Sequence, residues 1–185
     1  MPEINQNVFN TFPSIVTDRL VLRELNINDS EAVFGMRISK AVNRFIARLV
    51  PAGAGDMEIL VKQCAAAFTE KRGIAWAGEI KSMPGNIIGT CGSNKIDHDN
   101  LRAELGGEMS ETYWGRKLAF EATDAIVNFG FESLKLHSLE AKVLPSNRSA
   151  IAMLQALGFQ QDAYFKDRFM FQQKFYDLAV YSLVK

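Results

Sequence analysis

The sequence predicts a mixed α/β fold in which a mostly antiparallel central sheet of about seven strands is flanked by about four helices. Three observations lead to this fold class. Several short segments alternate apolar and polar residues, as strands do, and longer segments carry an apolar stripe with a helical period. A strand, a helix and a strand follow one another in the middle of the chain, which implies one parallel pair. No repeat or linker divides the 185 residues, so a single domain, 17–185, is expected after an N-terminal arm, 1–16.

The first elements come after the arm, which has no clear period. Residues 17–25, TDRLVLREL, alternate well enough to predict a strand. Residues 28–42 are expected to form a helix, because an Asn-Asp pair can cap it and an acid follows in the first turn. A turn rich in Pro and Gly separates it from a second predicted helix, 56–73, which has apolar residues on one face and a glycine at its end.

The middle of the chain is rich in strands. Residues 74–80 and 87–96 are apolar runs joined by a Pro-Gly turn, and this pattern predicts a hairpin. A third strand, 101–109, follows another turn. The next segment, 110–131, begins as a loop and continues as an amphipathic helix.

The last third of the chain repeats these patterns. Residues 135–144 alternate as a strand, and 145–159 are typical of a capped helix that ends at a glycine. The tail, 159–185, is predicted to form two strands with a turn near Gln173–Lys174. A parallel pair around the middle helix would bring the N-terminus of that helix next to the ends of two strands, where an anionic ligand can bind.

Composition excludes several classes of function. Apolar residues make up 48% of the chain and charged residues 23%, as in ordinary globular proteins. The 21 Lys and Arg balance 21 Asp and Glu, which argues against nucleic-acid binding by bulk charge. Cys64 and Cys91 lack metal-ligand spacing and are expected to be small apolar residues in a reducing compartment. No signal peptide or membrane-spanning run is visible, so a cytoplasmic protein without membrane contact is predicted.

The loop that opens 110–131 has the features of a phosphate site. If the helix begins near Arg116, the N–H groups of its first turn carry the positive end of the helix dipole and can bind phosphate. Gly115 would let the turn approach a ligand closely, and Arg116 and Lys117 could add charge. Cations at a helix N-terminus are unfavourable unless an anion is near. This favours a bound anion over a solvated basic turn, although both interpretations stay open here.

The order of elements now resembles a known family. Together with the segments TDRLVLREL, RAELGGEMSETYWGRKLAFEA and VLPSNRSAIAMLQALGF, it resembles the GNAT superfamily of acetyl-CoA-dependent N-acetyltransferases, and within it the RimJ/RimL-like group. The resemblance spans about residues 17–184, and the pattern from Asn147 to Phe159 is its most specific part. It implies a GNAT-like fold, acetyl-CoA as co-substrate, direct transfer to an amine without a metal, and an acceptor that is a protein N-terminus or a small molecule. A homodimer is compatible with it.

The resemblance also implies which residues bind the coenzyme. Lys117 stands where the family has a signature glycine, but backbone N–H groups can be presented by any residue with helical dihedral angles, so binding is expected to be retained. A bulge at Gly106–Gly107 would direct the N–H near Met109 to the thioester oxygen. Asn147 would contact the pantetheine, or only cap the next helix. The implied coenzyme-binding residues are Met109, Ser110, Gly115, Arg116, Lys117, Leu118, Ala119 and Asn147.

Two glutamates are candidates for the base that takes a proton from the acceptor amine. Glu104 matches the position of the acidic base in several family members, and Glu108 would share its side of a regular strand. Either could also be an ordinary exposed strand residue. The tyrosine that serves as general acid in many members is replaced by Leu154. Substitutes that are equally compatible with a structural role are Ser149, Tyr164 and Tyr176.

Other functions compete with catalysis. The changes at Lys117 and Leu154 also suit a GNAT-like module that senses acyl-CoA without transferring the group. A nucleic-acid-associated protein is a third candidate, which the zero net charge argues against. The acceptor groove is expected to be lined by residues 43–55 and 164–177, whose aromatic side chains could equally be packing residues.

Overall fold

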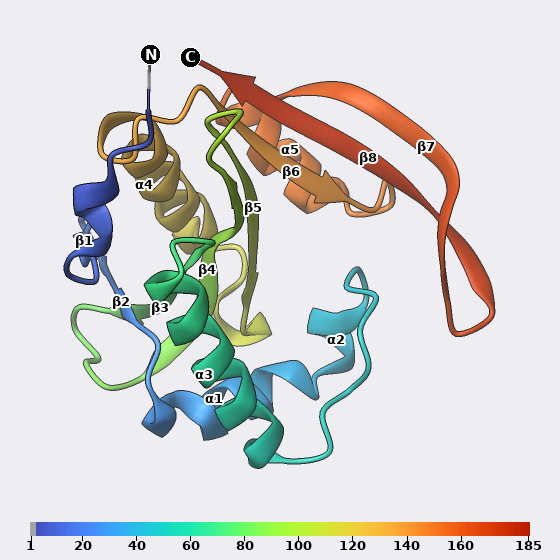
Figure 1. Cartoon of the computed structure of the whole chain (residues 1–185). Helices are drawn as coiled ribbons and strands as arrows, with labels where there is room; N and C mark the ends of the chain where they lie inside the picture. The colour runs from blue at the N-terminus through green and yellow to red at the C-terminus, as the bar shows by residue number, and fades with distance from the viewer. Residues whose placement is uncertain (1–2) are drawn as a thin grey trace.

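A computed structural model describes residues 3–185, apart from the side chain of Asn94, and confirms the predicted fold class. One mixed sheet has the strand order β1-β2-β3-β4-β5-β6-β8-β7, and β5–β6 is its parallel pair (Figure 1). The strands are β1 (Ile15–Val16), β2 (Leu20–Glu24), β3 (Ile74–Ile80), β4 (Ile87–Asp97), β5 (Arg102–Met109), β6 (Ser138–Val143), β7 (Gln160–Phe171) and β8 (Lys174–Val184). The helices are α1 (Ser30–Arg37), α2 (Lys40–Asn43), α3 (Ala54–Thr69), α4 (Leu118–Glu132) and α5 (Arg148–Ala156).

The helices cover both faces of the sheet. On one face, α1 and α3 pack on β3 through a small cluster that contains Val33, Val61 and Ala77. On the other face, α4 and α5 bury the larger core, in which Ile126 of α4 and Leu154 of α5 meet the strands. Within the described residues, no helix is long and apolar enough to cross a membrane.

Two N-terminal elements differ from the expectation. The predicted helix 28–42 is broken, because Ser39 caps a separate helix, α2, by accepting a hydrogen bond from the Val42 N–H. The arm contributes an eighth strand, since β1 pairs with β2. It is also held to the domain, because Trp76 donates from Nε1 to the carbonyl oxygen of Pro13 at 2.6 Å. Residues 1–2 of the predicted arm lie outside the described range.

The parallel strands β5 and β6 diverge after a short paired stretch (Figure 1). Their register runs from Arg102–Ser138 to Leu105–Ala141, and β6 then continues beside β8 alone. The divergence leaves one edge of the second half of β5 without a strand partner in the described chain. The two strands therefore form a fork whose inner corner is the Leu105–Ala141 pair.

The bulge predicted at Gly106–Gly107 is wrong, because the irregularity lies on β4. The β4–β5 register is continuous from Gly89–Met109 to Ser93–Leu105 and shifts at the next residue of β4. The glycines instead allow close approach of the two strands: a Cβ on Gly107 would lie 3.0 Å from the carbonyl oxygen of Thr90. Since β5 is regular, Glu104 and Glu108 lie on the same face of the sheet.

Strands β7 and β8 form a long hairpin that extends away from the body (Figure 1). The turn is Gln172–Gln173, one residue earlier than predicted, and both residues have positive φ, as in a two-residue type I′ turn. The β7 register shifts at Asp162 and again across residues 166–168.

Candidate active site

The open edge of β5 presents backbone amides to the fork. The Ser110 N–H donates to the carbonyl oxygen of Ile88 at 2.9 Å. Because residues of an antiparallel pair alternate between bonded and non-bonded positions, the N–H groups of Gly107 and Met109 point away from β4. In agreement, Trp114 donates from Nε1 to the carbonyl oxygen of Met109 at 2.8 Å. An extended ligand with amide groups, such as pantetheine, fits this edge.

The loop between β5 and α4 brings further amides to the same end of the fork. The first helical hydrogen bond of α4 runs from the Glu121 N–H to the carbonyl oxygen of Lys117 at 3.1 Å. The N–H groups of Leu118 and Ala119 therefore belong to the first turn and have no partner within the helix. Gly115 has φ +73° and open space around its missing Cβ. These features could hold a diphosphate, so phosphate binding at this loop stays a prediction.

Lys117 is not the first residue of a regular helix. It is the N-cap of α4, with φ 60° and ψ 14°, so the expectation of helical dihedral angles is wrong. The left-handed region favours glycine, and a residue with a Cβ there costs about 1–2 kcal/mol. The glycine of the family pattern is thus replaced at a position where the backbone conformation itself favours glycine. The helix begins at Leu118, two residues later than the predicted start near Arg116.

The start of α4 is tied by an ion pair to Arg19, the residue that precedes β2. Arg19 donates from Nε to Oε2 of Glu121 at 2.6 Å and from Nη1 to the carbonyl oxygen of Arg116 at 3.0 Å. Burial alone would raise the pKa of Glu121, but hydrogen bonds from Thr17 and Arg19 outweigh it and lower the pKa. The guanidinium of Arg116 lies 5.5 Å from the ring centre of Tyr113. These contacts hold the loop in one position relative to the sheet.

Ser110 and Asn147 have structural contacts of their own. The N–H of Ser110 is bonded to β4, so a contact of Ser110 with the coenzyme stays a prediction that only its hydroxyl could fulfil as a donor. Asn147 caps α5, because its Oδ1 accepts from the Ala150 N–H at 3.2 Å. This cap leaves the amide NH₂ of Asn147 as the group that can reach a ligand. Leu154 is buried in the core, and its aliphatic side chain has no proton to donate as an acid.

Glu104 lies one residue before the corner of the fork. Its carboxylate is partly exposed and accepts from Lys142 Nζ at 2.6 Å. Lys142 also contacts Oε1 of Glu140 at 3.2 Å. The hydrogen bond that Lys142 donates to Glu104 raises the pKa of Lys142, although partial burial opposes it.

Glu108 is almost fully buried between two arginines, and this arrangement disfavours it as the base. Arg37 of α1 donates from Nε to Oε1 at 2.7 Å. Nη2 of Arg48 lies 2.5 Å from Oε2, as an ion pair without hydrogen-bond geometry. Arg48 also donates to Asn43 at 2.8 Å. Glu108 therefore fixes the segment 44–53 over β5.

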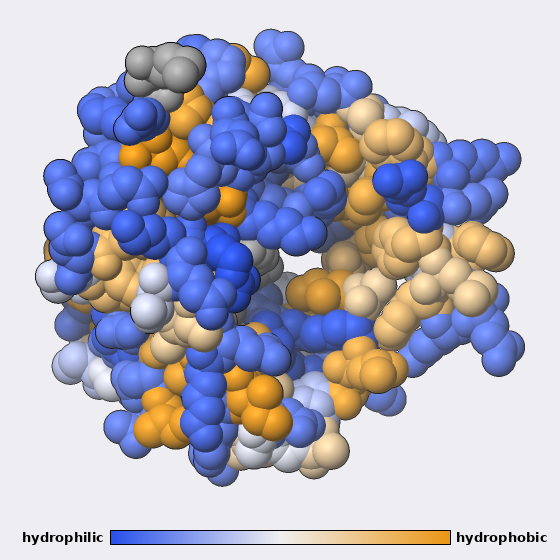
Figure 2. Space-filling model, in the orientation of Figure 1, coloured by the Kyte–Doolittle hydropathy of each residue, from blue (hydrophilic) through white to orange (hydrophobic). Residues whose placement is uncertain are grey.

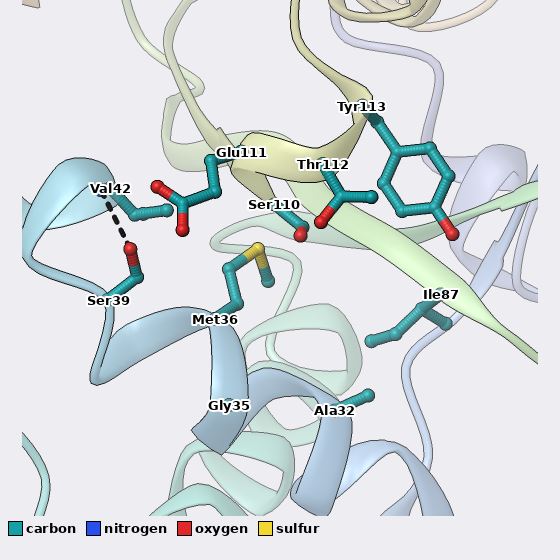
Figure 3. Close-up of a pocket in the computed structure, with 10 residues that line it drawn as sticks. All are labelled: Ala32, Gly35, Met36, Ser39, Val42, Ile87, Ser110, Glu111, Thr112 and Tyr113. Carbon is teal, nitrogen blue, oxygen red and sulfur yellow. Dashed lines mark hydrogen bonds between the residues drawn. The ribbon is translucent and has the colours of Figure 1, made fainter.

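A cavity of about 310 Å³ lies between α1, α2 and the residues that follow β5 (Figure 3). Hydroxyl groups of Ser110, Thr112 and Tyr113 line it, and Glu111 is the one charged residue among its described lining residues. A diphosphate would be repelled from a cavity whose charge is negative. The cavity is therefore suited to a neutral or cationic group and is distinct from the amide-lined fork.

The predicted acceptor segments lie near a hollow in the molecule. Figure 2 shows the hollow where Figure 1 has β5, the end of β6 and α2 around it. Leu49 and Val50 of the first segment and Met170 and Phe175 of the second are largely exposed. Two of the other candidate acids lie in the hairpin, where Tyr164 donates to Asp177 and the ring of Tyr176 stacks on Phe169, whereas Ser149 lies in the first turn of α5.

Sequence reasoning missed the partners of the glutamates. Arg37, Arg48 and Lys142 come from three elements that are distant in sequence, and no local pattern predicts that they meet β5. The alternation of β5 and β6 did predict which side chains share a face. The indole of Trp114, which bonds to Met109, was visible only as part of the family motif.

Comparisons with known proteins show which family the chain belongs to. Residues 19–160 match the family model described as the acetyltransferase (GNAT) domain. The chain is 33% identical to the uncharacterized N-acetyltransferase YoaA of Bacillus subtilis, and the match covers 94% of this chain and 98% of the relative.

Two solved structures share the fold. One is the microcin C7 self-immunity acetyltransferase MccE in complex with acetyl-CoA and AMP, with a TM-score of 0.83, 20% identity and coverage of 96% of this chain and 99% of that one. The other is the ribosomal-protein-S5-alanine acetyltransferase of Vibrio fischeri, with a TM-score of 0.83, 17% identity and coverage of 93% and 96%.

Proposed function

The chain belongs to the GNAT family of acetyltransferases, and from this premise we propose that it moves the acetyl group of acetyl-CoA to a primary amine with Glu104 as the base. The membership makes it an acetyl-CoA-dependent N-acetyltransferase, and the proposal places it in the RimJ/RimL-like group. The observation that carries the proposed mechanism is the partly exposed Glu104 carboxylate beside the corner of the β5–β6 fork.

The proposed binding mode uses the amides of the fork. The thioester supplies an acetyl group whose carbonyl carbon can be attacked by a neutral amine. The Met109 N–H would donate to the thioester oxygen, and the first turn of α4 would bind the diphosphate. Arg116 and Lys117 would add positive charge at the loop, and the Asn147 amide would donate to the pantetheine arm. The direction of the β5 amides and the open space at Gly115 support this mode.

Glu104 would remove the proton that every alkyl ammonium carries near neutral pH. The carboxylate is partly exposed, so an acceptor amine could reach it. Glu108, by contrast, has both oxygens engaged by arginines. The leaving thiolate would be protonated by water, since Leu154 replaces the family tyrosine.

The acceptor is proposed to be a protein N-terminus or a small-molecule amine. The exposed apolar side chains of residues 44–53 and of the β7–β8 hairpin support binding of an acceptor between them. The fold shared with a ribosomal-protein acetyltransferase is compatible with a protein N-terminus, and the cavity beside Glu111 is compatible with a small amine.

The test measures coenzyme A release with a panel of a short peptide, a polyamine, an amino acid and an amine-bearing antibiotic. Glu104→Gln should lower turnover by about 100-fold with a smaller change in coenzyme affinity. The matched control is Glu140→Gln, which removes another carboxylate partner of Lys142 and should keep most of the activity. Full activity of Glu104→Gln at every pH would exclude Glu104 as the base.

The alternative function is a sensor that binds acyl-CoA without transfer. Lys117 in the left-handed conformation is the observation that favours it, because it departs from the family glycine at the phosphate loop. Tight acetyl-CoA binding in calorimetry, with no thiol release across the panel and no effect of Glu104→Gln, would favour the sensor over the enzyme.

A further inference from the structure

Lys142 occupies a special position in the fork. It directly follows Ala141, the last residue of β6 that pairs with β5. Its Nζ lies 2.6 Å from Oε2 of Glu104 and 3.2 Å from Oε1 of Glu140. A primary amine of the chain is therefore held against the proposed base, beside the corner of the fork.

An acceptor amine has to meet two conditions in this site. It has to lie within hydrogen-bond reach of the base, and it has to lie near the acetyl end of the coenzyme. Lys142 fulfils the first condition at 2.6 Å and, given its place at the corner, stands beside the open β5 edge that the pantetheine arm would follow. We propose that the enzyme acetylates itself on Nζ of Lys142. This proposal rests on the proposed function and names a further acceptor for it.

The step balances as an ordinary acyl transfer. The Lys142 ammonium passes one proton to Glu104, which later releases it to water. The nitrogen lone pair then forms a C–N bond to the carbonyl carbon of the thioester, and the C–S bond breaks with its electron pair on sulfur. The second proton that leaves nitrogen ends on the thiolate. The products are Nε-acetyl-lysine, the coenzyme thiol and one proton, with no change in oxidation state.

The chain contains a matched control for this lysine. Lys185 forms an ion pair of the same length with Glu132, at 2.6 Å, but its N–H is bonded to His137 at the opposite end of β6 from the fork. Each of the two lysines is paired with a carboxylate, and they differ in their position relative to the fork. Chemical acetylation by the free thioester would not prefer Lys142, because Lys185 is the more exposed of the two.

The experiment incubates the purified full-length chain with acetyl-CoA that carries a deuterated acetyl group, without any added amine. Peptide mass spectrometry then follows the labelled acetyl group at Lys142 and Lys185 over time. We expect labelling of Lys142 to be at least about tenfold faster than of Lys185, and Glu104→Gln to slow it by about 100-fold without changing Lys185. Glu140→Gln should leave the preference for Lys142 intact.

A second measurement needs no coenzyme. Trace labelling of the free protein with acetic anhydride reports the reactivity of each lysine. Since Glu104 keeps the Lys142 ammonium protonated, Glu104→Gln should raise the reactivity of Lys142 and leave Lys185 unchanged. Unchanged reactivity of Lys142 would refute the contact on which the proposal rests.

The outcomes separate the two proposals. If added amines are acetylated while Lys142 stays unlabelled, self-acetylation is refuted and the proposed function stands. Equal labelling of Lys142 and Lys185, or labelling that does not depend on Glu104, also refutes it. If no amine receives an acetyl group and calorimetry detects no coenzyme binding, both proposals fail.

Discussion

Lys117→Gly is the change that tests the phosphate loop most directly. Lys117 caps α4 in the left-handed conformation and places a cation at the positive end of the helix dipole. Both features are unfavourable in the free protein. The substitution restores the glycine that the family pattern has at this position and keeps the backbone amides in place.

The expected magnitude follows from three contributions. Removing the Cβ at φ 60° relieves about 1–2 kcal/mol of backbone strain. Removing the cation from the helix N-terminus adds about 0.3–1 kcal/mol. The greater freedom of glycine in the unfolded chain takes back about 0.4–1 kcal/mol. The variant should be more stable by about 1 kcal/mol, which corresponds to about 2–4 °C in Tm for a domain of this size.

The assay is thermal and urea unfolding followed by circular dichroism, together with calorimetry of acetyl-CoA binding. Lys117→Ala separates the two causes, because it removes the charge and keeps the Cβ, so it should gain no more than the dipole contribution. Gly115→Ala is the mirror control. Its Cβ would meet no neighbour, so a loss of about 1–2 kcal/mol would report the positive φ alone.

Two results would refute the reasoning. If Lys117→Gly is less stable than the natural chain, the left-handed conformation carries no strain there. If Lys117→Gly and Lys117→Ala both lose more than about tenfold in acetyl-CoA affinity, the side chain itself holds phosphate, and the backbone account of the loop fails.

Three further predictions concern contacts around the site. Glu108→Gln should lower the free energy of unfolding in urea by about 3 kcal/mol, because it leaves two arginines without a counter-charge. Glu104→Gln should lower it by less than about 1 kcal/mol, because its ion pair is partly exposed. Equal losses in the two variants would contradict the difference in burial. Asn147→Ala should lose about 1 kcal/mol with the helix cap, while Asn147→Asp keeps the cap and should weaken only acetyl-CoA binding; an Asp variant that binds normally would leave Asn147 a cap alone. The lowered pKa of Glu121 means that its contacts stabilise the fold above the ordinary glutamate pKa and are lost as pH falls through the folded value. Glu121→Gln should therefore be destabilised at pH 7, and its deficit should shrink as pH falls below the ordinary glutamate pKa and vanish below the lowered folded pKa; a deficit that is the same in acid as at pH 7 would rule this out.

Local patterns predicted most of the fold. The alternation of the strands, the helical stripes and the turn residues are local signals, and each survives in the structure within a few residues. The errors have identifiable causes. In the sequence, Ser39 looks like an interior residue of one helix. In the structure it caps a second helix, because a serine side chain can bond to nearby backbone N–H groups and so compete with continuation of the first helix. The irregularity lies on β4, whereas Gly107 of β5 allows close approach of the two strands.

The candidate site was less predictable than the fold. The phosphate loop and the regular face of β5 could be derived from the sequence, because they depend on residues close in the chain. The side chains that form ion pairs with the two glutamates could not be derived in this way, because Arg37 and Glu108 are 71 residues apart and Glu104 and Lys142 are 38 apart. The sequence alone does not distinguish Glu108, whose carboxylate is buried in the folded chain, from Glu104, whose carboxylate is partly exposed.

The irregular outer strand has a consequence for how the protein behaves in a crowded solution. β7 is the last strand of the sheet and offers 12 residues along its free side. An unbroken edge of that length would be a template for another chain and for fibril growth. The extra residue at Asp162 and the out-of-register residues 166–168, two of which are cationic, interrupt that template. The protrusion can therefore stay exposed without recruiting copies of itself through its backbone.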